Sequence, residues 1–99
     1  MNDFDAYLTE DARLVILKAL HLEADGRLHD NALVVALDTY GHRRSRDWVR
    51  TQLRKLADLQ ALHIREAGTV MVAEIRQAGV DHLELRGRIE GIALPSRSS

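Results

Sequence analysis

The spacing of apolar residues changes near residue 62, and this change constrains the chain to a mixed α+β fold. Up to about residue 60, apolar residues recur at three- and four-residue steps, which is typical of amphipathic helices. Between Leu62 and Ile75 apolar positions alternate instead, with Ala67-Gly68-Thr69 between them, and this pattern predicts two short strands joined by a turn. A chain of 99 residues without an internal repeat forms one compact domain.

Two helices are expected in the first part of the chain. The first extends from Thr9, as N-cap, to about Glu23 and stops at Asp25-Gly26. The second fits Asp30 to Tyr40, with Asp30 or Asn31 capping it and Gly41 at the position after its C-cap. The apolar side chains that define their buried faces are Leu8, Ala12, Val15, Ile16, Ala19, Leu20, Leu22, Leu33, Ala36, Leu37 and Tyr40.

A third helix, over residues 45–60, precedes the predicted hairpin. Ser45 is its N-cap candidate, and its apolar residues are Val49, Leu53, Leu56 and Ala57. After the hairpin a fourth helix fits Gln77 to about Leu85, although Gly79 interrupts it near its start. Residues 1–86 are therefore assigned to one domain and residues 87–99 to a partly flexible C-terminal extension.

The order of these elements predicts a specific arrangement. Two helices joined by a short turn and followed at once by a two-stranded hairpin form a winged helix-turn-helix, an α+β fold that is mainly helical. In such a fold the helix over residues 45–60 corresponds to the recognition helix.

Basic residues are concentrated in one segment, although the whole chain is nearly neutral. The chain has 14 Lys and Arg against 15 Asp and Glu, a formal net charge of −1. Residues 43–55 contain six of the basic residues and one acidic residue, Asp47. A run of charge is often only the solvated face of a helix. These cations are nearly all arginine and belong to one segment, which favours a binding surface.

The helix over residues 45–60 turns several of these side chains outward. If Val49 marks the buried direction, Leu53 lies within about 40° of it at 100° per residue, and Thr51 and Arg54 point to solvent. One α-helix fits the major groove of DNA, and the amides at its N-terminus bind phosphate. The residues expected to contact double-stranded DNA are Arg43, Arg44, Ser45, Arg46, Asp47, Arg50, Thr51, Arg54, Lys55 and Arg65.

Within this set each residue type suits a different contact. Arg50 and Arg54 are expected to reach guanine edges or phosphates. Thr51 is expected at a base edge or a phosphate, and Asp47 can accept from a cytosine amino group. We expect Arg65 to supply the single cation of the wing tip.

A competing hypothesis is a protein-interaction module without DNA binding. The hairpin tip, residues 65–69, has one cation and one anion and offers little to a phosphate backbone. Asp58 lies on the outward side of the third helix and repels phosphate. Trp48 suits a protein interface, but it equally fits packing against the turn or the second helix.

No arrangement of residues in the sequence indicates catalysis or a cofactor. The absence of cysteine excludes thiolate metal sites and a cysteine nucleophile. Helix capping alone explains Ser45. The longest apolar run, Ala32–Leu37, is far shorter than the roughly 20 residues that span a bilayer. We therefore expect a cytoplasmic chain that is not an enzyme and binds no metal, cofactor or small-molecule substrate. Five scattered histidines are expected at surface or boundary positions: His21, His29, His42, His63 and His82.

The sequence resembles a family of small proteins encoded in Mu-like prophages of Proteobacteria, which are labelled ArsR-type winged-helix regulators. The resemblance extends almost from end to end and is densest at Ser45–Leu53. Other matching segments are Asp11–Leu17, Ala78–His82 and Ile89–Ile92. It implies a winged-helix fold, a phage or prophage origin and a role in DNA binding.

Together these features predict a small winged helix-turn-helix protein that regulates prophage genes in the cytoplasm of its bacterial host. Paired half-sites are the usual way in which such a short reader gains specificity, so a C2 dimer is expected. The first helix and the C-terminal segment are expected to supply its apolar surface, through Leu83, Leu85, Ile89, Ile92 and Leu94.

Overall fold

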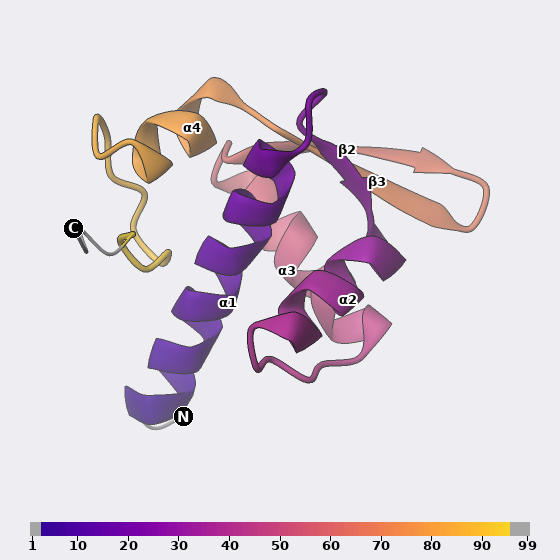
Figure 1. Cartoon of the computed structure of the whole chain (residues 1–99), viewed down its shortest axis with the longest axis horizontal. Coiled ribbons are helices and arrows are strands. Elements are labelled where there is room, and N and C mark those ends of the chain that lie inside the picture. Colours follow the sequence, from indigo (N-terminus) through magenta and orange to yellow (C-terminus); the bar gives the residue numbers. More distant parts are fainter. Residues whose placement is uncertain (1–2, 96–99) are drawn as a thin grey trace.

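The computed structural model describes residues 3–95 and is mainly helical, with one small antiparallel sheet (Figure 1). In chain order the elements are α1 (Asp3–Leu22), β1 (Arg27–His29), α2 (Asp30–Thr39), α3 (Arg46–Asp58), β2 (Leu62–Ala67), β3 (Val70–Ile75) and α4 (Gln77–Leu83). The β2–β3 hairpin projects beyond the helices as a wing (Figure 1). The predicted α+β fold, with a hairpin directly after the third helix, is confirmed and is consistent with a winged helix.

Helix α1 is longer than predicted, because the chain is already helical at Asp3 and Thr9 lies inside the helix. Asp3 and Asp5 are in its first turn, where negative charge is favourable to the helix dipole. Its apolar stripe fills the centre of the core, with Ile16 and Leu20 fully buried. Leu22 was expected on this stripe, but it is 78% exposed at the end of the helix.

Helix α2 ends as predicted, at a glycine with positive φ. Gly41 has φ +89°, its N–H donates to Asp38 O, and the next N–H, of His42, donates to Leu37 O. This pair of bonds is a Schellman motif. Tyr40, expected in the core, is 61% exposed because the helix has already ended at Thr39.

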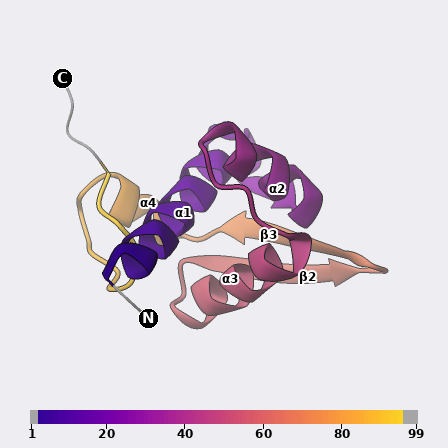
Figure 2. The ribbon, with the colours of Figure 1, turned by 90° about the horizontal axis from the view of Figure 1, so that it is seen from below.

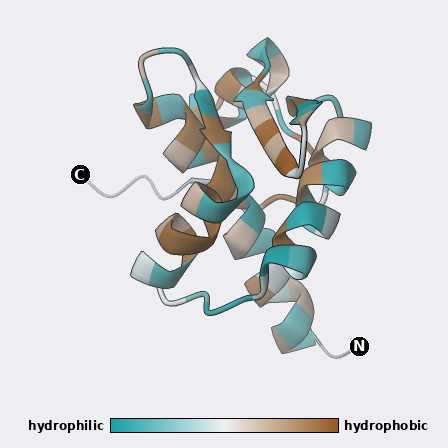
Figure 3. Cartoon of the chain, turned by 90° about the vertical axis from the view of Figure 1, so that its right-hand side faces the viewer, coloured by the Kyte–Doolittle hydropathy of each residue, from teal (hydrophilic) through white to brown (hydrophobic). Residues whose placement is uncertain are grey.

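Helix α3 and the hairpin are confirmed nearly residue for residue. The Ser45 hydroxyl accepts the Trp48 N–H at 3.1 Å, which is the predicted N-cap. Val49, Leu53 and Leu56 are fully buried. Figure 3 shows hydrophobic and hydrophilic segments alternating along the helices, as this amphipathic pattern requires.

The sheet has a third strand that the sequence did not predict. Its order is β1-β3-β2, and both pairs are antiparallel. Leu28 of β1 faces Ala73, and Ile64 of β2 faces the same residue from the other side. Ala73 is fully buried, so this face of the sheet packs on the helices. The opposite face is the outer face, and it is formed by the alternate residues of each strand.

The C-terminal part packs beside α1 (Figure 2). Gly79 of α4 is buried, and a Cβ added at this position would lie 2.5 Å from Ala61 O. The glycine that seemed to interrupt this helix therefore permits a close approach to the backbone. Ile92 is buried against the core, and Ala93 N–H donates to Glu10 O at 3.1 Å. Residues 87–95 are thus docked on the domain, and residues 96–99 of the expected extension lie outside the described part.

Candidate nucleic-acid interface

A buried carboxylate connects α3 to the start of α2. Asp30 is fully buried, and its Oδ2 accepts from Arg46 Nε at 3.0 Å and from Arg50 Nε at 2.6 Å. The Nη2 groups of both arginines donate to the carbonyl oxygen of Thr69, in the turn of the wing. We call these four residues the Asp30 hub. The hub fixes α2, α3 and the wing relative to one another.

The hub also determines the protonation state of its carboxylate. Burial alone would raise the pKa of Asp30, but hydrogen bonds from Arg50, Arg46 and the Asn31 N–H outweigh it, so the pKa of Asp30 is lowered from its ordinary value. The carboxylate is therefore ionised at neutral pH. Two guanidinium groups against one carboxylate leave a net positive charge where the wing meets α3.

Arg46 and Arg50 thus have an internal role that the sequence did not indicate. Their side chains are 39% and 22% exposed. Each guanidinium has five N–H donors and directs two of its nitrogens at hub acceptors. The side chain of Arg50 is directed at Asp30 and the wing turn. To contact a guanine edge as expected, Arg50 would therefore have to use an N–H group that is not bound in the hub, or leave the hub.

Two further arginines flank the N-terminus of α3. Arg43 Nε lies 3.3 Å from Asp38 Oδ1, and the Arg43 side chain is 94% exposed. The Arg44 guanidinium lies 4.5 Å from the centroid of the Trp48 ring, a cation–π contact. Trp48 is half-buried and packs against the core. These contacts agree with the expectation that Trp48 packs against the turn before α3.

The outward side of α3 carries the rest of the predicted set. Asp47, Thr51, Arg54 and Lys55 are all exposed, as the helical spacing predicts. The Thr51 hydroxyl donates to Asp47 O at 3.1 Å and keeps its lone pairs available as acceptors. Asp58 is exposed at the end of the helix. We call the four exposed cations of this region the α3 basic surface; they are Arg43, Arg44, Arg54 and Lys55.

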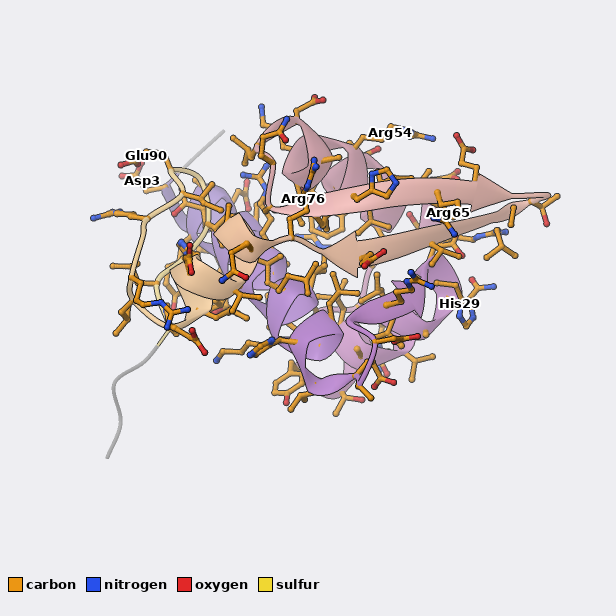
Figure 4. All side chains as sticks on the ribbon, turned by 90° about the horizontal axis from the view of Figure 1, so that it is seen from above. Asp3, His29, Arg54, Arg65, Arg76 and Glu90 are labelled. Atoms are coloured by element: carbon orange, nitrogen blue, oxygen red, sulfur yellow. The ribbon has the colours of Figure 1, made fainter. Side chains whose placement is uncertain are left out.

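Arg65 lies apart from this surface. Its cross-strand neighbour is Val72, whereas the buried Ala73 faces Ile64. The alternation along β2 therefore puts Arg65 on the outer face of the sheet, turned away from the helices. Figure 4 labels Arg54 on α3 and Arg65 on the hairpin. The structure thus divides the predicted contacts between two sides of the molecule.

Two of the five histidines are buried, contrary to the expectation that all lie at surface or boundary positions. His82 is fully buried: its Nδ1 accepts the Ile89 N–H at 3.0 Å, and its Nε2 lies 2.9 Å from Ala93 O. His42 Nε2 lies 2.7 Å from Asp11 Oδ2. His42 links residues 31 positions apart, and His82 links α4 to residues seven and eleven positions further along the chain. Neither pairing follows from the spacing within a single helix. His21, His29 and His63 are exposed as predicted.

The C-terminal segment is fastened to α1 and α3 by one arginine. Arg13 donates from Nε to Gln52 Oε1 and from Nη1 to Gly91 O, each at 2.8 Å. Burial lowers the pKa of Arg13, opposed by the nearby Glu10. Ile92 is buried, and Leu83 and Ile89 are partly buried against the core. Leu85 and Leu94 remain 38% and 44% exposed.

Metal-binding clusters and membrane-spanning helices are absent from the described residues. Within residues 3–95, no three His, Asp or Glu side chains lie close enough together to hold a metal ion. None of the helices in the same range is long and apolar enough to cross a membrane.

Comparison with known proteins gives two related sequences. Over 88 residues the chain is 38% identical to "Uncharacterized protein gp26" of Escherichia phage Mu, covering 89% of this chain and 91% of that protein. It is 41% identical over 75 residues to an "Uncharacterized protein" of Haemophilus influenzae, covering 75% and 72%. No protein-family model and no solved structure matches the chain. The expected relationship to phage Mu is confirmed.

Proposed function

Because the chain belongs to the family of the phage Mu protein gp26, we propose that it is a winged helix-turn-helix protein that binds double-stranded DNA and regulates phage or prophage genes. In this proposal α3 lies in the major groove. The protein acts in the cytoplasm of a bacterial host, without catalysis or a cofactor.

The observation that carries the proposal is the exposure of the α3 basic surface along and just before a helix whose opposite side is buried in the core. Arg54 and Lys55 are exposed one turn after Thr51 and two turns after Asp47. The buried Val49 and Leu53 hold the opposite side of α3 in the core. A rigid helix with an outward cationic side suits the major groove, which admits one α-helix.

Each exposed residue then has a distinct contact. Arg54 and Lys55 reach base edges or phosphates, and the Thr51 hydroxyl accepts a hydrogen bond at a base edge. Arg43 and Arg44 hold phosphates beside the N-terminus of α3, where the helix dipole attracts anions as well. The Asp30 hub positions α3 and contributes its net positive charge to the surface.

A salt titration tests the proposal. Binding of random duplex DNA is measured by fluorescence anisotropy between about 50 and 200 mM salt, and the affinity is expected to fall by a factor of order 10³ if several phosphates are contacted. The double variant Arg54→Ala/Lys55→Ala should flatten the slope of log K against log salt by about 2. Lys18→Ala, a substitution at an exposed position of α1, is the control. Absence of wild-type binding at low salt contradicts the proposal.

A second candidate function, a protein-interaction module, is favoured by one observation. Leu22, Val35 and Tyr40 are 78%, 66% and 61% exposed, and they lie around a shallow hollow of about 300 Å³ between α1 and α2. Exposed apolar groups that cluster mark protein contacts. If the chain does not bind DNA, this function is tested by whether the wild type retains a host or phage protein. The function is favoured if Tyr40→Glu abolishes this retention and Arg54→Ala/Lys55→Ala leaves it unchanged.

A homodimer that reads paired half-sites also uses this region. Leu22 lines a second hollow of about 240 Å³ with Tyr40, Leu83 and Pro95, which joins α1 to the C-terminal segment. We expect sedimentation velocity to show a concentration-dependent dimer that Leu22→Glu dissociates. A strict monomer at high concentration contradicts the dimer but leaves DNA binding by α3 open to the salt titration.

A further inference from the structure

The outer face of the sheet gathers basic and titratable residues from three strands. Across the strands one row is Arg27, Glu74 and His63, and the next row is His29, Val72 and Arg65. In these two rows the edge strands β1 and β2 contribute only arginine and histidine. The central strand β3 contributes one carboxylate, Glu74, and one apolar side chain, Val72. Sequence reasoning missed this set because it depends on β1, which has only three residues.

This face is open and carries a small hollow. A hollow of about 190 Å³ is lined by Arg27, His63, Arg65, Val72 and Glu74. Arg27 Nε lies 3.1 Å from Glu74 Oε1, and the two side chains are 45% and 39% exposed. Helices α1, α2 and α3 lie on the other side of the sheet (Figure 1), and Figure 4 views the molecule from the side of the outer face.

The charge of this face depends on two histidines. With both neutral, Arg27 and Arg65 against Glu74 give a net charge of +1; with both protonated it is +3. His63 faces Glu74 across the strands and has Arg65 beside it on β2, while His29 has Arg27 on its own strand and Val72 opposite. Asp30, which follows His29, is buried and bound to Arg46 and Arg50. Histidine is the side chain whose charge commonly changes between about pH 5 and pH 8.

We propose that the outer face of the sheet is a second phosphate-contacting surface, which binds the phosphodiester backbone of duplex DNA through Arg65, Arg27, His63 and His29. The proposal rests on the proposed function, DNA binding by α3. It assigns the contact between the wing and the DNA backbone to the outer face of the sheet. The wing turn is poorly suited to this role, because residues 66–70 contain no basic side chain and one carboxylate, that of Glu66.

The salt slope at two pH values tests this surface. Each additional phosphate contact steepens the slope of log K against log salt by about 0.9. Protonation of the two histidines is therefore expected to make the wild-type slope steeper at pH 6 than at pH 8, by at most about 1.8. The variant His29→Gln/His63→Gln should show the same slope at both pH values, and Arg65→Ala should lower the slope by about 0.9 at both. His21→Gln, at an exposed position at the end of α1, is the control and should behave as the wild type.

The outcomes separate the two proposals. If Arg54→Ala/Lys55→Ala flattens the slope while the double histidine variant and Arg65→Ala match the wild type at both pH values, the outer-face proposal is overturned and binding by α3 stands. If only the outer-face variants change the slope, the outer face binds DNA and the role given to α3 is wrong. If the wild type does not bind at low salt at pH 6 or pH 8, both are overturned. Circular dichroism confirms that the variants are folded.

Discussion

Arg50 Nε lies 2.6 Å from Oδ2 of the fully buried Asp30, and this contact connects α3 to the first residue of α2. Arg46 approaches the same oxygen, and both arginines also reach the Thr69 carbonyl in the wing. Under the proposed function, α3 needs a fixed position relative to the wing. A shift of α3 or of the wing would change which parts of the DNA these two elements contact. The hub supplies this fixation with charged hydrogen bonds, which are stronger than neutral ones.

Replacing the carboxylate of the hub should destabilise the fold. Asp30→Asn removes the charge that faces Arg46 and Arg50, and we expect the free energy of unfolding to fall by about 2 kcal/mol at pH 7. Urea denaturation followed by circular dichroism measures the change. Asp38→Asn, which affects only the exposed pair with Arg43, is the control and should have little effect. Equal effects of the two substitutions would contradict a structural role for the hub.

The same variant should show a pH dependence of defined sign. Because the pKa of Asp30 is lowered in the folded protein, its stabilising contribution is fully present above the ordinary aspartate pKa of about 3.9 and is lost as the pH falls below it. The difference in unfolding free energy between wild type and Asp30→Asn is therefore expected to stay constant from pH 7 to about 5. It should shrink towards pH 3. A difference that grows on acidification would contradict the assignment.

Arg50 and Arg54 are one helical turn apart but should respond differently to truncation. Arg50→Ala removes a hub contact and is expected to lower the unfolding free energy by about 2 kcal/mol. Arg54 is exposed, so Arg54→Ala should change it by less than about 0.5 kcal/mol. Weaker DNA binding by Arg54→Ala without a loss of stability would identify a contact residue, whereas Arg50→Ala alone cannot separate contact from positioning.

The close approach at α4 gives a prediction about packing. In Gly79→Ala the new methyl group would lie 2.5 Å from Ala61 O and 2.9 Å from Ile75 Cγ1, so α4 has to move away from the hairpin base. We expect a loss of about 1 to 2 kcal/mol, since overpacking outweighs the better helix propensity of alanine. Gly87→Ala is the control, because its nearest atom, Asp81 Cβ, is at an ordinary 3.6 Å. Thermal unfolding of both variants measures the difference.

The sequence predicted the helix bodies and the hairpin because each contains enough residues to show its period. It missed β1, since the three residues from Arg27 to His29 are too few to alternate visibly and become a strand only by pairing with β3. The same limit applies to the site. The cations of α3 were visible as a cluster, but the partner of Arg50 is 20 positions away, and Asp30 was interpreted only as a helix cap.

Helix ends were predictable only where a glycine marks them. All three of α2, α3 and α4 are followed by a residue with positive φ, namely Gly41 at +89°, Gln60 at +66° and Leu85 at +61°. In each case the next residue donates back to the final turn, as His42 to Leu37 O, Ala61 to Leu56 O and Arg86 to Asp81 O. The packing of α3 and α4 fixes this geometry in spite of the side chains, which is why the predicted ends extended to Gln60 and Leu85.

This geometry predicts a stabilising substitution at the end of α3. Gln60 is exposed, and its side chain accepts one hydrogen bond, from Arg76 Nη1. A left-handed conformation costs a non-glycine residue about 1 kcal/mol, so Gln60→Gly should raise the unfolding free energy by somewhat less than this amount after the loss of the Arg76 contact. Gly41→Ala is the reciprocal test: nothing lies within 4 Å of the added Cβ, so a loss of about 1 kcal/mol there would come from the backbone alone. Urea denaturation of the two variants should therefore shift the midpoint in opposite directions. A lower midpoint for Gln60→Gly would show that the contact between Gln60 and Arg76 contributes more to stability than the backbone conformation costs.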